Sequence, residues 1–448
     1  MALSGLAIYK LLPKTNCKEC GFPTCLAFAM QLAAKKTTLD KCVKVSEEAK
    51  QALAGASQPP IKLVTLGSPE RTLAVGNETV LFRHEETFYH PTGISLLLED
   101  TLSDAECKAR IGQIDKLVFH RVGQAIEVNA VALKNTSKDD AVFASKSKLL
   151  AQATQLGIIL ITESGPALTK ALEAVGKRRP LIYAAAPQNY ELFGTIAKQY
   201  NVPLAVRGNS LDELADLTQR LKGLGVEEMV LDIGSKDLLS RLTDLVNVRR
   251  LALKKTFRPL GYPTIVFTDT DDPFQEALAA ATYIAKYASI VVMKNCHSWA
   301  LLPVLVARQD IYTDPQKPVQ VEPKVYEIGA VSKKSPVIVT TNFSITYFTV
   351  EGEVEASKVP TYIVACDSEG MSVLTAWAAE KFTPEKISDT LAACGIASKV
   401  AHKNVVIPGY VAVMSGKLED ISGWKVLVGP REAAGIPAFL KTLSLQAV

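Results

Sequence analysis

Between residues 93 and 311 the chain repeats one pattern: a short apolar run, a polar turn, and a segment whose apolar residues have helical spacing. Continuous apolar runs are typical of parallel strands that are buried on both faces. Eight such β-α units in about 220 residues predict a (β/α)8 TIM barrel, with a doubly wound sheet as the alternative. The expected strands span residues 94–98, 125–129, 157–161, 181–184, 203–206, 229–232, 264–267 and 289–293.

Polar residues stand where several of these strands end. Such positions often carry catalysis in barrels. They also supply the hydrogen bonds that strand ends and helix starts need, and Asp271-Asp272-Pro273 has the pattern of a helix N-cap. No pair among them forms a defensible acid and base, so we expect the barrel to be mainly a scaffold and docking surface. The strand-end residues are Glu163, Arg207-Gly208-Asn209, Asp232, Asp269 and Asn295.

The segment before the barrel, residues 58–92, contains a linker and two short alternating runs. These predict strands at residues 62–66 and 79–83. His84 and His90 lie close by, and a metal site there is conceivable. Two polar residues on a hairpin are the favoured interpretation.

After a linker with three prolines at residues 312–324, a second β-α pattern runs from 325 to 448. It predicts a small Rossmann-like open α/β domain of four parallel strands, with helices near 371–377, 384–395 and 431–443. Ligands of such sheets bind beyond the carboxyl ends of the strands, and each strand here ends in a small or glycine-containing turn. Either these are ordinary turns or they form a platform for a large cofactor. The expected strands are 337–342, 361–367, 404–409 and 424–430.

No G-x-G-x-x-G follows these four strands, and no G-x-x-x-x-G-K-[ST] occurs in the chain. A dinucleotide cofactor and an ATP-driven activator are therefore both disfavoured.

The first 57 residues contain Cys17, Cys20, Cys25 and Cys42, at the spacing C-x2-C-x4-C-x16-C. Four thiolates from one short segment match the ligands of a [4Fe–4S] cluster. A structural zinc site is the first rival, although zinc ribbons prefer two C-x2-C knuckles, and four buried structural cysteines are the second. Helices are expected at 26–34 and 46–54, followed by a linker at 55–60.

Length and charge limit the classes of function. A chain of 448 residues suggests two to four domains, and 50 basic against 46 acidic residues argue against nucleic acid or a membrane surface as the main partner. No apolar run reaches the length of a membrane span, and the first residues lack the features of a signal peptide. The other four cysteines are scattered singly, so we expect a cytoplasmic protein in a reducing, oxygen-poor cell.

The order of these parts resembles the large (gamma) subunit family of corrinoid iron–sulfur proteins, also described as the acetyl-CoA decarbonylase/synthase gamma subunit family. The resemblance rests on the four-cysteine motif and on the segments 340–348, 368–373 and 429–437. It implies a [4Fe–4S] cluster bound by the four cysteines and a cobalamin-type corrinoid bound by the C-terminal loops. The implied corrinoid contacts are Thr340, Thr341, Asn342, Phe343, Ser344, Thr346, Gly370, Met371, Ser372, Val373, Leu374, Gly409, Tyr410, Gly429, Pro430, Arg431, Glu432 and Ala433.

The resemblance also implies a methyl carrier of the reductive acetyl-CoA (Wood–Ljungdahl) pathway of carbon fixation, a methyltransferase component whose chemistry occurs at cobalt. Co(I) would accept a methyl group from methyltetrahydrofolate on a separate methyltransferase. Methyl-Co(III) would donate it to acetyl-CoA synthase/CO dehydrogenase, and the cluster would reduce inactive Co(II) with electrons from a low-potential donor. A smaller barrel subunit would complete a heterodimer.

The chain departs from the D-x-H-x-x-G motif of many corrinoid-binding domains, because Asp367-Ser368-Glu369-Gly370 has no histidine. We therefore expect base-off cobalt without a protein ligand beneath it, which makes Co(II) easier to reduce. Two alternatives remain: a pterin-dependent methyltransferase, for which Asp232 and Asn295 are candidates, and a purely structural iron–sulfur subunit.

Overall fold

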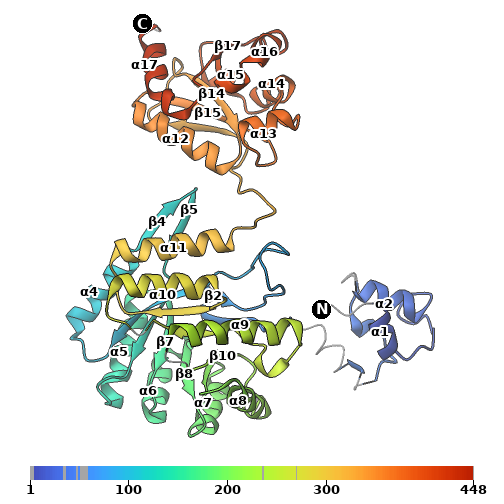
Figure 1. Ribbon diagram of the computed structural model, residues 1–448, viewed down its shortest axis with the longest axis vertical. Helices are drawn as coiled ribbons and strands as arrows, with labels where there is room; N and C mark the ends of the chain where they lie inside the picture. The colour runs from blue at the N-terminus through green and yellow to red at the C-terminus, as the bar shows by residue number, and fades with distance from the viewer. Residues whose placement is uncertain are drawn as a thin grey trace. The chain divides into compact units, whose positions relative to one another are not determined.

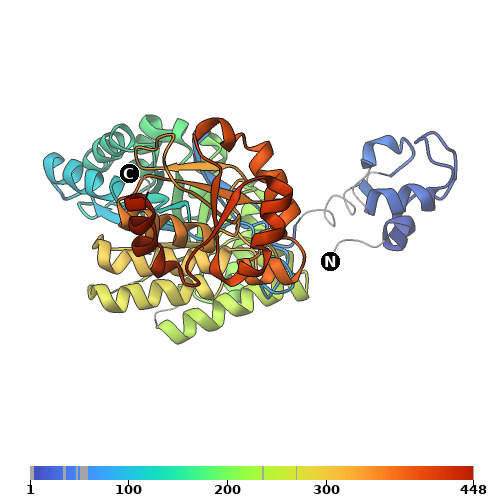
Figure 2. The same cartoon turned by 90° about the horizontal axis from the view of Figure 1, so that it is seen from above.

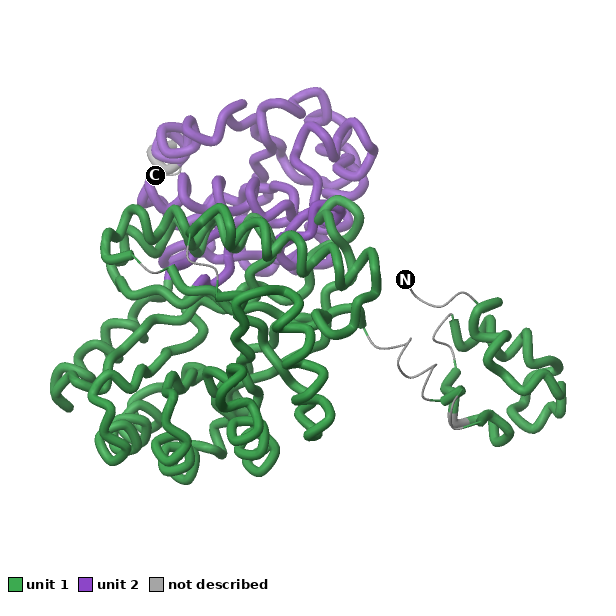
Figure 3. Tube along the Cα trace, turned by 60° about the horizontal axis from the view of Figure 1, so that its bottom comes forward, with its two compact units in different colours: residues 1–118, 127–312 green, residues 119–126, 313–448 purple. Residues whose placement is uncertain are grey.

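The computed structural model describes residues 5–33, 37–46, 49–50, 59–234, 237–268 and 270–446 of the chain. It divides into two compact units (Figure 3). The first comprises residues 1–118 and 127–312, and the second comprises residues 119–126 and 313–448. Each unit is described by itself.

The first unit contains an eight-stranded parallel sheet that closes on itself. Its strand order is β10-β9-β8-β7-β6-β3-β12-β11, and a bridge between Leu231 and Thr264 joins β10 to β11. The predicted (β/α)8 barrel is therefore confirmed. The strands are β3 (Gly93–Glu99), β6 (Ala130–Lys134), β7 (Gly157–Ile161), β8 (Leu181–Ala185), β9 (Leu204–Arg207), β10 (Met229–Asp232), β11 (Ile265–Phe267) and β12 (Ile290–Met293).

Helices lie outside the barrel and connect its strands (Figures 1 and 2). Side chains cap several of their first turns; Asp272, for example, accepts a hydrogen bond from the Phe274 amide at 2.9 Å, so its predicted N-cap role is confirmed. The helices are α4 (Asp104–Asp115), α5 (Asp140–Ala153), α6 (Gly165–Val175), α7 (Tyr190–Tyr200), α8 (Leu211–Gly223), α9 (Leu238–Lys254), α10 (Pro273–Ala285) and α11 (Ser298–Tyr312).

One of the eight expected barrel strands is wrong. Residues 125–129 do not enter the barrel; β6 at Ala130–Lys134 does. β5 (Gln124–Glu127) instead pairs with β4 (Val118–Arg121) through Val122 and Gly123, which have the positive φ angles of a tight hairpin turn. Half of the hairpin side chains are exposed. In β6, by contrast, every residue except the last one is buried. Residues 119–126 also belong to the second unit, so they interrupt the expected barrel range of 93–311.

A second hairpin closes the amino end of the barrel. β1 (Val64–Ser68) and β2 (Arg71–Val75) pair antiparallel, and their apolar side chains join the core inside the barrel. Leu73 and Leu66 lie against Gly93 and Gly157, the first residues of two barrel strands. The predicted strand at 62–66 thus overlaps β1. The prediction of a strand at 79–83 is wrong, because the partner of β1 lies earlier in the chain.

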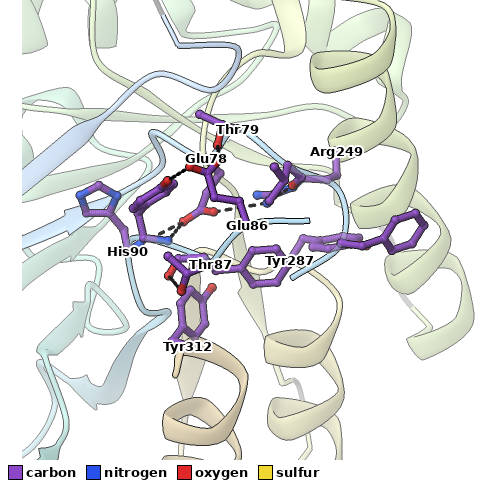
Figure 4. A network of polar contacts seen from close by, with 12 residues as sticks. Glu78, Thr79, Glu86, Thr87, His90, Arg249, Tyr287 and Tyr312 are labelled. Carbon is purple, nitrogen blue, oxygen red and sulfur yellow. Dashed lines mark hydrogen bonds and ion pairs between the residues drawn. The ribbon is translucent and has the colours of Figure 1, made fainter. Parts of the chain in front are cut away.

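Residues 77–92 are instead held by a buried ion pair (Figure 4). Arg249 of α9 pairs with Glu78 at 3.3 Å and also donates to the carbonyl of Val80. The Glu78 carboxylate accepts the backbone amides of Tyr89 and His90 at 2.9 and 3.0 Å. With its backbone bonded to side chains, the segment has no need of a β partner.

The second unit contains a five-stranded sheet of order β13-β15-β14-β16-β17. β14 (Val337–Thr341), β15 (Thr361–Cys366), β16 (Asn404–Ile407) and β17 (Lys425–Val428) are parallel, which confirms the predicted open α/β fold. β13 (Val325–Ile328) is an antiparallel edge strand that the sequence analysis missed, because it is only four residues long and none of its residues is fully buried.

Helices cover both faces of this sheet. α12 (Ser344–Ser357) and α17 (Ile436–Gln446) pack on one face, and α14 (Pro384–Ala393) and α16 (Ser415–Ser422) pack on the other. The short helices α13 (Val373–Ala378) and α15 (Ile396–Lys399) complete the unit.

The N-terminal residues form a small core of their own. α1 (Gly5–Leu11) was not predicted, whereas α2 (Cys25–Ala33) matches the expected helix at 26–34. The helix expected at 46–54 falls mostly outside the described residues. No described helix has the length and apolarity to cross a membrane.

Replacing Glu78 with Gln should leave the Arg249 guanidinium, which is 6% exposed, without its counter-charge. We expect the free energy of unfolding in urea to fall by about 3–5 kcal/mol. Asp216→Asn, which removes an exposed ion pair with Arg220 on α8, should cost no more than about 1 kcal/mol. Equal losses in the two variants would contradict the role given to the buried pair.

Candidate functional site

The four N-terminal cysteines belong to one small unit. Cys25 and Cys42 are buried in a core with Ile8 and Phe28, and Cys20 packs against it. Cys25 is the first residue of α2, and the Cys42 amide donates to the Leu39 carbonyl at the end of a 3-10 turn (Leu39–Lys41). Two elements of regular structure therefore fix the last two cysteines, and a loop carries Cys17 and Cys20.

That loop curls tightly and is fastened at both ends. Asn16, Lys18 and Gly21 all have positive φ, a backbone conformation typical of tight turns. The side chain of Asn16 accepts the Cys25 amide at 2.8 Å, and the Asn16 amide donates to the Cys25 sulfur at 3.4 Å. An amide directed at a cysteine sulfur is the contact that stabilises a metal-bound thiolate.

The charged side chain of Lys44 lies beside this loop. Lys44 pairs with Glu19 at 2.7 Å, and this hydrogen bond, together with a smaller attraction to Cys17, raises the pKa of Lys44. The described residues contain no group of three His, Cys, Asp or Glu side chains close enough to hold a single ion. A [4Fe–4S] cluster binds each thiolate through a separate iron, so its cysteine sulfurs stand farther apart than the ligands of one ion.

The second candidate site is the carboxyl edge of the second unit's sheet, where the loops after β14, β15, β16 and β17 lie. Asn342, 1% exposed, organises two of these loops. Its Oδ1 accepts the amides of Ser368 and Gly370 at 2.9 and 3.2 Å and the Ser368 hydroxyl at 2.9 Å. One buried amide thus holds the loop after β15 against the end of β14.

A strap formed by residues 318–321 crosses this edge. Val321 donates to the Asn342 carbonyl, Ser344 donates to Val319, and Asn342 Nδ2 donates to Gln320 Oε1, at 2.9, 2.9 and 3.0 Å. Gln320 and Pro318 approach Gly370 so closely that a Cβ there would lie 2.7–2.9 Å from them. The sequence analysis missed Gln320, because a proline-rich linker carries no periodic signal.

The loops after β16 and β17 pack backbone to backbone. Gly409 donates to Pro430 at 3.0 Å, and a Cβ on Gly409 would meet the Gly429 carbonyl at 2.5 Å. Tyr410 donates its hydroxyl to Glu432, and this hydrogen bond raises the pKa of Tyr410. Glycine is therefore required at position 409 by the close approach of the two backbones.

Exposed apolar side chains gather along the same edge. Leu374 and Trp377 on α13 are 45% and 42% exposed, and Val413, in the 3-10 turn after β16, is 76% exposed. Ile345 on the first turn of α12 and Tyr410 add to them. Trp377, Val413 and Ile345 were not among the predicted contacts. The signal available was helical spacing, since Leu374 and Trp377, like Tyr410 and Val413, are three residues apart.

The predicted contacts divide by burial. The first group is buried beneath the strap and the loops, and in it the hydroxyl oxygens of Thr340 and Thr341 have no hydrogen-bond partner among the described residues. The second group is half-buried or exposed. The buried residues are Thr340, Thr341, Asn342, Ser344 and Gly370. The accessible ones are Phe343, Thr346, Met371, Ser372, Val373, Leu374, Gly409, Tyr410, Gly429, Pro430, Arg431, Glu432 and Ala433.

No histidine occurs in these four loops. His402 precedes β16, at the amino end of the sheet, where its Nε2 lies 2.9 Å from the Ser335 carbonyl. His84 and His90 belong to the first unit, and the described residues around them form no metal-binding group.

A family model described as "CO dehydrogenase/acetyl-CoA synthase delta subunit" matches residues 63–440, and one described as "Putative Fe-S cluster" matches residues 12–44. The corrinoid/iron-sulfur protein large subunit of Moorella thermoacetica is 48% identical over 441 residues, covering 98% of this chain and 99% of that protein. The chain belongs to this large-subunit family. The acetyl-CoA decarbonylase/synthase complex subunit gamma of Methanothermobacter thermautotrophicus is 37% identical, covering 99% of this chain and all of that protein. The expected family is confirmed.

Dihydropteroate synthases are among the solved structures to which this chain is similar. The enzyme of Thermus thermophilus is 15% identical with a TM-score of 0.40, covering 55% of this chain and 100% of that chain. That of Xanthomonas albilineans is 12% identical with a TM-score of 0.40, covering 57% and 100%. At these scores the likeness says nothing about ligands.

Asn342→Ala should release the loop at residues 368–371, because the Ser368 and Gly370 amides lose their shared acceptor. Leaving such buried donors unpaired costs about 1–3 kcal/mol. Amide hydrogen exchange in this loop should accelerate accordingly, whereas Asn404→Ala, at the exposed amino end of β16, should leave it unchanged. Unchanged exchange in Asn342→Ala would refute the organising role of this amide.

Proposed function

We propose that this chain is the large subunit of a methyl-carrying corrinoid iron–sulfur protein of the reductive acetyl-CoA pathway. The observation that carries the proposal is the exposed apolar edge of the C-terminal sheet, in a chain whose N-terminal unit also holds four cysteines. A flat, largely apolar macrocycle matches such an edge, since its face can cover Leu374, Trp377 and Val413. The likeness to the Moorella protein over both chains' lengths supports the same assignment.

Cys17, Cys20, Cys25 and Cys42 hold a [4Fe–4S] cluster, which supplies low-potential electrons when bound. Asn16 fastens the loop around it by bonding to Cys25 on α2. Lys44 lies beside this loop, where its charge is paired with Glu19. The hydrogen bond from the Asn16 amide to the Cys25 sulfur favours the reduced cluster.

The C-terminal loops hold the corrinoid, whose cobalt supplies the methyl-accepting and methyl-donating chemistry when bound. The accessible loop residues after β15 and β17 lie where a ligand beyond the sheet edge would contact them. The apolar side chains on α13 and after β16 exclude water from one face. Because these loops contain no histidine, the cobalt receives no imidazole from them, and its reduction is easier without that donor.

The chain acts with partners. A smaller barrel subunit pairs with it, a methyltetrahydrofolate methyltransferase loads the methyl group, and acetyl-CoA synthase/CO dehydrogenase removes it. A low-potential electron donor reduces the cluster. The movement of one carrier between these partners requires the corrinoid edge to be reachable, and the exposure of Leu374, Trp377 and Val413 provides that access.

The first test is metal analysis and a redox-poised optical spectrum of anaerobically purified protein, expressed with its natural partner. We expect about one cobalt and four irons per chain, and a Co(II) spin-resonance spectrum without axial nitrogen splitting. Iron without cobalt would leave only a redox or structural subunit. Zinc in place of iron would overturn the cluster assignment, and axial nitrogen would overturn the base-off assignment.

Cys42→Ser should lower the iron content and weaken the cluster's absorbance, because serine replaces one of the four thiolates. Cys296→Ser provides the control, since Cys296 is a half-buried thiol of the barrel unit. The measurement is iron per chain together with the reducibility of bound cobalt by a low-potential donor. Because a serine oxygen can still bind iron, Cys42→Ala is measured as well, and four irons retained in the alanine variant would remove Cys42 from the ligand set.

Gly409→Ala should reduce the cobalt retained per chain, because the new Cβ meets the Gly429 carbonyl at 2.5 Å and the Arg431 amide at 2.9 Å and displaces both loops. Gly416→Ala on α16 is the matched control, since its Cβ would meet nothing within 4 Å. We expect full cobalt in the control and at least about a tenfold weaker hold on the corrinoid in Gly409→Ala, given the cost of overpacking. Equal cobalt in both would contradict this placement.

A further inference from the structure

The carboxyl mouth of the barrel contains a cavity of about 1150 Å³. Glu163, Arg207, Asn209 and Asp232, which were interpreted as strand-end and capping residues, all line it. Asp269 lies outside the described residues, and Asn295 does not line the cavity. Pockets of this kind at this end of a barrel are the usual place for a ligand. The expectation that the barrel is mainly a scaffold and docking surface leaves this cavity without a role.

The floor of the cavity is aromatic and apolar. The rings of Tyr183 and Phe267 meet edge to face with centroids 5.0 Å apart. Leu97, Ile161 and Val292 lie around them. Such a floor favours a flat ring over a hydrated ion, because it can bury the ring face but cannot replace a hydration shell.

The Asp232 carboxylate, at the floor of the cavity, already has hydrogen-bond and ion-pair partners within the protein. Asp232, 8% exposed, accepts the Tyr183 hydroxyl and the Gly234 amide, the latter at 3.1 Å, and lies 3.7 Å from Arg207 Nε. These partners neutralise its charge and fix its orientation. Asp232 therefore shapes the floor and offsets little of the positive charge on the rim.

Basic groups outnumber acidic ones along the described lining. Arg241 donates to the Phe267 carbonyl, and Lys294 pairs with Asp271 at 2.9 Å. Lys134 and Lys138, both after or at the end of β6, are exposed and have no ion-pair partner among the described residues. A cleft lined mainly by one sign of charge attracts ligands of the other sign.

Asn135 lies between these two lysines in sequence, and only the nitrogen of its side-chain amide has a partner among the described residues. Asn135 Nδ2 donates to Thr162 Oγ1 at 3.0 Å, whereas its buried Oδ1 has no partner among the described residues. A buried acceptor without a donor is unfavourable unless a ligand or water supplies one. The β6 side of the mouth thus offers two free cations and one free acceptor.

We propose that the barrel mouth binds a small organic anion, namely a flat ring that carries a carboxylate or phosphate. The ring lies on the Tyr183–Phe267 floor, the anionic group faces Lys134 and Lys138, and an N–H or O–H of the ligand satisfies Asn135. None of the residues that line this site belongs to the cysteine unit or to the loops of the second unit. It gives the barrel a binding role that stands whether or not the chain carries a methyl group.

The test uses the full-length protein and a matched pair of fluorescent probes, 1-naphthoate and the neutral 1-naphthamide. Equilibrium titration should show the carboxylate binding at least about fivefold more tightly than the amide, with the difference shrinking in high salt. The double variant Lys134→Gln/Lys138→Gln should lose this preference. Lys222→Gln, on the exposed last turn of α8, should retain it.

The variant Trp377→Ala tests whether the probe binds in the barrel or at the apolar edge of the second unit. We expect the preference for the carboxylate to survive in this variant. Equal binding of the two probes, an unaltered preference in the double lysine variant, or loss of the preference in Trp377→Ala or Lys222→Gln would each overturn the proposal.

Discussion

Both units depend on one constraint: a parallel strand is buried on both faces, so it has no free surface along its length. The barrel strands and the central strands of the second unit are almost wholly apolar and buried. Polar chemistry is therefore confined to the places where strands end and the backbone opens. The barrel cavity and the loops organised by Asn342 both stand at carboxyl ends, and the hairpin β1–β2 fills the opposite end of the barrel with apolar side chains.

This constraint also explains how far the sequence could be interpreted. Seven of the eight barrel strands and all four parallel strands of the second unit were predicted. A short continuous apolar run is typical of a strand that is buried on both faces. The failures have a different physical origin. At 125–129 the apolar residues Ile126 and Val128 are buried, so the segment has the apolar pattern of a barrel strand although it does not enter the barrel. At 79–83 the alternation was real, but a distant arginine, Arg249, supplies the backbone's hydrogen bond instead of a neighbouring strand.

The sequence predicted which segments form the cysteine site and the loop site, but it did not predict the contacts within them. Spacing identified the four cysteines, yet nothing in the spacing reveals that Asn16 bonds to Cys25 across nine residues. The loops of the second unit were expected at the sheet edge, but only the structure separates buried organisers such as Asn342 from exposed side chains such as Trp377. The barrel cavity was missed because its residues come from several strands, each with a plausible local role as a cap or strand end. Side chains that converge only after folding leave no local pattern.

The strap has a mechanical consequence. Residues 318–321 are bonded across the end of β14 and pressed on Gly370, so the chain that enters the second unit is fastened to the loops before it reaches its first strand, β13. Tension along residues 313–317 is therefore transmitted to the backbone of Asn342, and through its side chain to Ser368 and Gly370. The connecting segment is therefore attached to the loops at the carboxyl edge, and a displacement of this segment would move these loops directly.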